Sequence, residues 1–149
     1  MIQRIIAIDY GRRHIGLAIS DPLASFALPL ETLRVPNAKA DKIQLLLDHL
    51  AATQNITQFV VGDPLHMSGQ PSEMSQEIRQ FAKDLEARSH LPVALIDERL
   101  TSSQSETLLK EQNYSRKKRA KLVHNTSAMI LLQNYLDLNK GAISIPSID

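Results

Sequence analysis

The feature that most constrains the fold is the alternation of short apolar runs with amphipathic helices in the middle of the chain. Two runs, Gln58–Gly62 (QFVVG) and Pro92–Ile96 (PVALI), are typical of strands that are buried on both faces. Apolar residues at helical spacing predict a helix over Asp41–Ala52 and another over Ser72–Arg88. Because a helix then connects one buried strand to the next, we expect these strands to pair in parallel.

The first third of the chain predicts three further strands without helices between them. Ile5–Ile8 is a short β-branched run, and His14–Ser20 alternates apolar residues, so a turn at 11–13 joins the two as a hairpin. Ser25–Leu33 is a weaker strand, and prolines around it suit the edge of a sheet. The sequence therefore predicts an α/β fold with a mixed five-stranded sheet, an antiparallel meander plus parallel strands, and helices on both faces.

The last third of the chain is expected to be helical. Ser103 and Glu106 form an S-x-x-E capping box that predicts the start of a third helix. A last helix is predicted from Ser115 to Leu138, with Gly141 marking its end and 139–149 as a loose tail. The 149 residues contain no repeats and no linker, so we expect a single domain over 1–149.

Composition narrows the classes of function. The chain has no cysteine, which excludes disulfides, thiolate zinc sites and cysteine nucleophiles. The net charge is +1, so a nucleic-acid partner has to be argued from local patches. No stretch approaches the roughly 18 apolar residues of a membrane span. We therefore expect a soluble, cytoplasmic protein without a membrane partner.

Carboxylates follow two of the predicted buried strands directly. Asp9 ends the first strand, and Asp97 and Glu98 end the PVALI strand. Ligands of open α/β sheets usually bind at this carboxyl edge. Because successive strand residues point to opposite faces, only one of Asp97 and Glu98 can easily face Asp9. We interpret Asp97 as the more structural of the two, a residue that caps a loop or pairs with a neighbour.

The last helix adds a histidine to these acids. His124 lies on a stripe with helical spacing that we expect to pack on the sheet, formed by Ala120, His124, Ala128, Leu131, Tyr135 and Leu138. Asp9, Glu98 and His124 from three elements would suit Mg²⁺ or Mn²⁺ in metal-assisted phosphodiester hydrolysis. His124 has two other interpretations, as a proton carrier or as a hydrogen-bonded core residue.

A basic segment opens the last helix, where positive charge opposes the helix dipole. Contact with phosphates would favour such charges, although a solvated surface is the simpler interpretation. The segment consists of Arg116, Lys117, Lys118, Arg119 and Lys121. Arg12 and Arg13 lie beside Asp9 and could hold the same backbone. Aromatic residues make up only 4%, which argues against base stacking and favours structured or duplex nucleic acid.

Four segments of this sequence resemble the YqgF-type, Holliday-junction-resolvase-like family. They are IAIDYGRRHIGLAIS, VVGDPLHMSGQ, LIDERLTSSQSE and, more weakly, LVHNTSAMILLQNYLD. The resemblance implies a ribonuclease H-like fold and a divalent-metal nuclease site with Asp9 and Glu98 as its acids. It also implies a role in 5′ maturation of pre-16S ribosomal RNA, with cleavage of branched DNA as an alternative.

Two residues depart from the family pattern. The family usually has an aspartate on the last helix where this chain has His124, and a hydrophobic residue where it has Asp63. Asp63 ends the fourth predicted strand, so we hypothesise that it compensates for the missing aspartate. The simpler interpretation is that Asp63 caps the loop that follows it.

One other function remains open at this point, and another is disfavoured. Loss of the helix aspartate could leave a nucleic-acid-binding ribosome-assembly or transcription factor that has little or no nuclease activity. Sugar kinases also begin with a strand that ends in D-x-G, but they need a second domain, and this chain has no Gly-rich phosphate loop.

The expected partner is structured RNA rather than branched DNA, in the context of ribosomal precursor particles. The sequence carries no dimerisation signal, so monomer and dimer both stay open.

Overall fold

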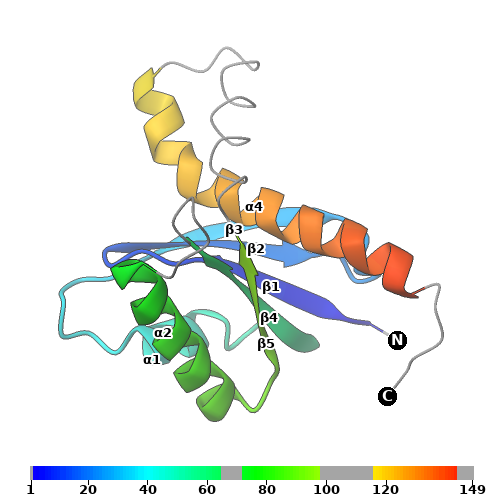
Figure 1. The fold of residues 1–149 in the computed structure, drawn as a ribbon, viewed down its shortest axis with the longest axis horizontal. Coiled ribbons are helices and arrows are strands. Elements are labelled where there is room, and N and C mark those ends of the chain that lie inside the picture. The colour runs from blue at the N-terminus through cyan, green and yellow to red at the C-terminus, as the bar shows by residue number, and fades with distance from the viewer. Residues whose placement is uncertain (1, 65–71, 98–115, 144–149) are drawn as a thin grey trace.

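The computed structural model describes residues 2–64, 72–97 and 116–143, with the backbone alone described at 116–125 and 140–143. Figure 1 shows a sheet with helices on either side. The strands are β1 (Arg4–Asp9), β2 (His14–Ser20), β3 (Ala27–Arg34), β4 (Ile56–Asp63) and β5 (Val93–Asp97). The helices are α1 (Lys42–His49), α2 (Glu73–Ser89) and α4 (Arg116–Ile143). None of the helices described is long and apolar enough to cross a membrane.

The five strands form one mixed sheet in the order β3-β2-β1-β4-β5. β2 pairs antiparallel with β1 and with β3, and this is the predicted meander. β4 pairs in parallel with β1 and with β5, as expected for strands that are joined through helices. The predicted sheet is therefore confirmed, and β2, β1 and β4 occupy its interior.

The alternation of side chains along β1 divides the core into two layers. Ile6 and Ile8 pack with the helices α1 and α2 on one face of the sheet. Ile5 and Ala7 pack on the other face, against α4. Figure 1 shows this arrangement, with α4 on one side of the sheet and α1 and α2 on the other. Any residue of β1 can thus be assigned to a helix layer from its place in the strand.

The predicted elements that fall within the described residues are present, and two of their predicted first residues are caps. The side chains of Asp41 and Ser72 accept hydrogen bonds from the first turns of α1 and α2. The helix predicted to begin at Ser103 lies outside the described residues.

The last helix ends later than the sequence predicts. α4 does not stop near Leu138 but continues through Gly141 to Ile143. A glycine inside a helix costs about 1 kcal/mol relative to alanine, which is too little to end a helix by itself. Leu138 is 71% exposed, so it does not belong to the packed stripe, whose buried side chains are Ala128, Leu131, Leu132 and Leu136.

Candidate functional site

Asp9 is the last residue of β1, a strand with neighbours on both sides. It pairs with Gly16 of β2 and is partly exposed. It lies two residues after Ala7, which packs on α4, so strand alternation directs Asp9 to the α4 face. The turn that follows needs glycine, because a Cβ on Gly11 would lie 2.3 Å from the carbonyl oxygen of His14. This combination presents a carboxylate at the carboxyl edge of the sheet, as the sequence predicts.

Asp97 and Asp63 end the neighbouring parallel strands and lie on the other face. The two residues are register partners, so they share a face of the sheet. Asp63 bonds to Ser75 and Arg79 on α2, which places that face on the side of α1 and α2. Alternation along β4 and β5 thus directs Asp63 and Asp97 away from the face of Asp9. Asp97 therefore does not face Asp9, and Glu98 lies outside the described residues.

Asp63 is almost fully buried, and its side chain is engaged with α2. It accepts a hydrogen bond from the hydroxyl of Ser75 and forms an ion pair of 3.0 Å with Nε of Arg79. Only 5% of its side chain is exposed. These contacts fasten the first turns of α2 to the end of β4, which favours a structural role. Compensation for the helix aspartate stays a prediction, and the contacts do not favour it.

Sequence reasoning missed Ser75 and Arg79. The signal that could have found them is their spacing of four residues on α2, which places both on one helix face.

His124 and the basic segment belong to the first half of α4. His124 stands one helical turn before Ala128, which is buried against the sheet. The basic residues from Arg116 to Lys121 occupy the first turns of the helix, which rise away from the sheet in Figure 1. The side chains of these residues are outside the description, so their predicted roles in metal and phosphate binding stay predictions.

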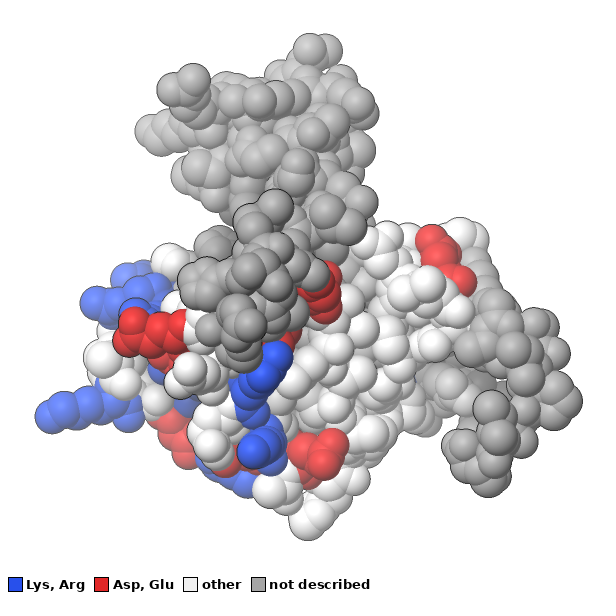
Figure 2. All heavy atoms as spheres, in the orientation of Figure 1, with Lys and Arg blue, Asp and Glu red and all other residues white. Residues whose placement is uncertain are grey.

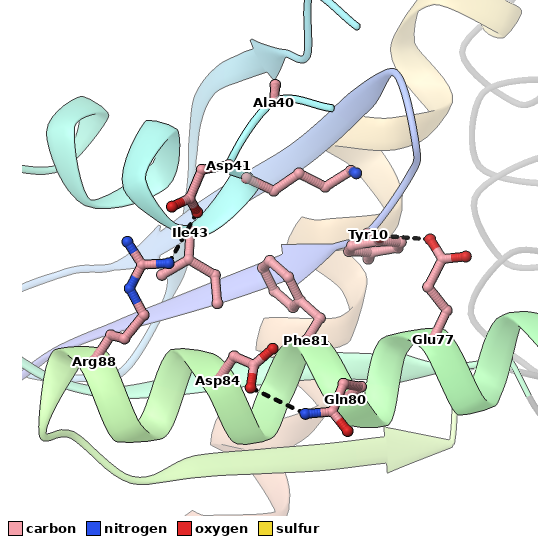
Figure 3. Close-up of a pocket in the computed structure, with 10 residues that line it drawn as sticks. Tyr10, Ala40, Asp41, Ile43, Glu77, Gln80, Phe81, Asp84 and Arg88 are labelled. Carbon is pink, nitrogen blue, oxygen red and sulfur yellow. Dashed lines mark hydrogen bonds and ion pairs between the residues drawn. The ribbon is translucent and has the colours of Figure 1, made fainter. Parts of the chain in front are cut away.

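Arg12 and Arg13 lie in the turn after Asp9, and both already have partners. Nε and Nη2 of Arg12 donate to Oε1 of Glu77 at 3.0 Å and 2.9 Å. The hydroxyl of Tyr10 donates to Oε2 of the same carboxylate, as Figure 3 shows. The bond from Arg12 holds the pKa of Glu77 below its usual range, so this carboxylate stays ionised. Nη1 of Arg13 donates to the carbonyl oxygen of Pro36 at 3.1 Å.

Glu77 is a residue that sequence reasoning missed, because it lies 65 positions from Arg12 on α2. Glu77 joins the turn after Asp9 to α2, which packs on the face of the sheet opposite to that of Asp9. The turn is therefore held in place by tertiary contacts as well as by Gly11.

Of the three expected metal ligands, Asp9 is the one whose side chain the structure describes. A partly exposed carboxylate at a sheet edge has the hard oxygen donors that Mg²⁺ and Mn²⁺ prefer. Within residues 2–64, 72–97 and 116–143, no group of three or more histidine and acidic side chains is placed to hold a metal ion. The other two expected ligands, Glu98 and the side chain of His124, are outside that description.

Comparison with known proteins finds a family that matches nearly the whole chain. The family model RuvX, described as Holliday junction resolvase, matches residues 3–138. A protein of Protochlamydia amoebophila named "Putative pre-16S rRNA nuclease" is 41% identical over 139 residues, which cover 90% of this chain and 93% of that protein. A protein of Koribacter versatilis with the same name is also 41% identical, over 90% of this chain and 86% of its own length.

The fold is similar to that of a solved RuvC structure. The structure of Thermus thermophilus RuvC in complex with Holliday junction substrate superposes with a TM-score of 0.55 at 14% identity, over 93% of this chain and 96% of that chain. This likeness confirms the predicted ribonuclease H-like layout of the sheet and its helices.

Proposed function

Because the chain belongs to the RuvX family of Holliday junction resolvases, we propose that it is a nuclease that hydrolyses phosphodiester bonds in precursor 16S ribosomal RNA. Relatives named for that substrate, 41% identical over most of the chain, support the choice of RNA. The observation that carries the proposal is the position of Asp9, at the end of an interior strand and on the face covered by α4.

The proposed catalytic residues are Asp9, Glu98 and His124. Asp97 faces the other layer, so we propose the next residue in the sequence, Glu98, as the second acid of the site. His124 is carried by α4, the helix that covers the face of Asp9. In this proposal Asp9 and Glu98 hold Mg²⁺ or Mn²⁺, and His124 completes the site or moves a proton. A divalent ion bound there would supply an activated water and charge stabilisation for the leaving oxygen.

The proposed phosphate contacts come from two basic elements. Arg12 and Arg13 lie in the turn that directly follows Asp9, and the 116–121 segment lies within one to two turns of His124. Cations that bind phosphates on either side of the site would position the backbone without reading its sequence. This suits a structured RNA in a ribosomal precursor particle, and we propose a cytoplasmic protein.

Branched DNA is the second candidate substrate, and the description of the matching family favours it. A four-way DNA junction therefore belongs beside the RNA in any test. Cleavage of the junction with no cleavage of the RNA would replace the proposed substrate and keep the proposed chemistry.

The test is cleavage of a structured RNA fragment that spans the 5′ end of 16S ribosomal RNA and its precursor sequence. The purified protein is incubated with the fragment in Mn²⁺ or Mg²⁺, with added chelator and with Asp9→Asn as controls. We expect cleavage that requires both the ion and Asp9. Tight binding without cleavage in either ion would contradict a nuclease and indicate a nucleic-acid-binding assembly factor.

A further inference from the structure

A cationic pocket lies beside the turn after Asp9, on the α1 and α2 side of the sheet. It has a volume of about 450 Å³ and is lined by Tyr10, Arg12, Arg13, Ala38, Lys42 and Glu77. Pockets for small ligands span roughly 300–1,000 Å³, so this one has room for a nucleotide-sized group. Figure 2 shows Lys and Arg side chains, with Asp and Glu side chains among them, at the left of the view, where Figure 1 draws this turn and the loop before α1.

The charge of the pocket favours an anion. Its wall carries three cationic side chains and one carboxylate. A neighbouring pocket of about 440 Å³ shares Tyr10, Lys42 and Glu77 but adds Asp41, Asp84 and Arg88, so its carboxylates outnumber its cations. Figure 3 shows this neighbour, bounded at one end by Tyr10 and Glu77 and at the other by Asp41 and Arg88. Of the two pockets, the one beside the turn therefore has the charge that favours an anion.

The cations of the pocket are held in place and still have donors to offer. Glu77 binds Nε and Nη2 of Arg12, and within the described residues no hydrogen bond uses Nη1. Arg13 is fixed by a backbone carbonyl, so its charge is not neutralised there. The ammonium of Lys42 lies 5.9 Å from the centre of the Tyr10 ring and, among the residues described, forms no ion pair. Donors fixed in this way lose little entropy when a phosphate binds.

We infer that this pocket binds a backbone phosphate of the nucleic-acid substrate at a distance from the bond that is cleaved. The inference rests on the proposed function and adds Lys42, with Tyr10 and Glu77 as residues that position the cations. Tyr10 follows Asp9 directly, and its side chain packs in the opposite layer. The bound strand therefore passes around the end of β1, from the face of Asp9 to the face of α1 and α2.

The test measures binding of the RNA fragment in chelator, where no cleavage occurs, over a range of salt concentrations. Lys42→Gln and Arg13→Gln are compared with Lys83→Gln, which removes an exposed lysine of α2 that does not line this pocket. We expect each pocket variant to lose affinity by roughly tenfold, the scale of one charge-assisted hydrogen bond. The slope of the logarithm of the association constant against the logarithm of the salt concentration should become less steep by about 0.7–0.9, as for one lost phosphate contact. The affinity and the slope of Lys83→Gln should equal those of the wild type.

Each other outcome overturns the inference in a distinguishable way. If both pocket variants bind like Lys83→Gln while the wild type cleaves the fragment, the pocket does not bind substrate and the proposed function stands. If the wild type does not bind nucleic acid at all, the inference and the proposed function fail together. If Lys42→Gln weakens binding of a mononucleotide but not of the fragment, the pocket serves a free nucleotide. Thermal unfolding of every variant checks that the fold is intact.

Discussion

At the scale of single residues, strand alternation separates the acids of the sheet edge into two sets. Asp9 faces α4, whereas Asp63 and Asp97 face α1 and α2. The sequence could predict that Asp9 ends a buried strand, because the apolar run before it is unambiguous. It could not predict the partners of Asp63, because Ser75 and Arg79 reach it through the packing of α2 on the sheet.

Replacement of Asp63 by alanine should lower stability and leave the chemistry in place. The change leaves the buried Ser75 without its acceptor, which costs about 1–3 kcal/mol in the free energy of unfolding. Urea denaturation of Asp63→Ala and of Asp84→Ala, an exposed acid on α2, measures the difference. A variant that keeps wild-type stability but loses metal-dependent cleavage would instead support the compensating role of Asp63.

At the scale of elements, α4 is attached to the sheet by apolar packing and by hydrogen bonds of Tyr135 and Gln133. Oε1 of Gln133 accepts from the amide of Ala27 at 2.9 Å, and Nε2 donates to the carbonyl oxygen of Ser25 at 3.2 Å. The sequence could predict the apolar stripe of α4 from its period. It could not predict the hydrogen bonds of Gln133, because their partners lie more than 100 positions away along the chain. Nor could it predict the true end of α4 beyond Gly141, because a single glycine is a weak stop.

The variant Gln133→Ala should weaken the attachment of α4 to the β2–β3 hairpin. Loss of two hydrogen bonds to the backbone should cost about 1–2 kcal/mol in the free energy of unfolding. Gln80→Ala is a matched control, because Gln80 and Gln133 both bond to an aspartate four residues later, while only Gln133 also bonds the hairpin in the described structure. Equal stability of the two variants by urea denaturation would contradict this assignment.

At the scale of the whole molecule, the mixed sheet brings the candidate site and the cationic pocket to one end of the sheet. It places them on its two opposite faces. The sequence predicts the meander, the parallel strands and the helices on both sides, and the structure confirms them. The cationic pocket could not be predicted, because it is assembled from the turn after β1, the start of α1 and the first turns of α2. Such a site exists only once the layers are packed.

The most direct test of this account compares Asp9→Asn with Asp97→Asn in single-turnover cleavage of the RNA fragment in Mn²⁺. Both changes remove one carboxylate charge from the end of a strand, but on opposite faces of the sheet. We predict that Asp9→Asn lowers the cleavage rate by about 100-fold or more, the scale of one lost group that stabilises developing charge. Asp97→Asn should stay near the wild-type rate. Equal losses in the two variants, or an active Asp9→Asn, would contradict the placement of the site on the face of Asp9.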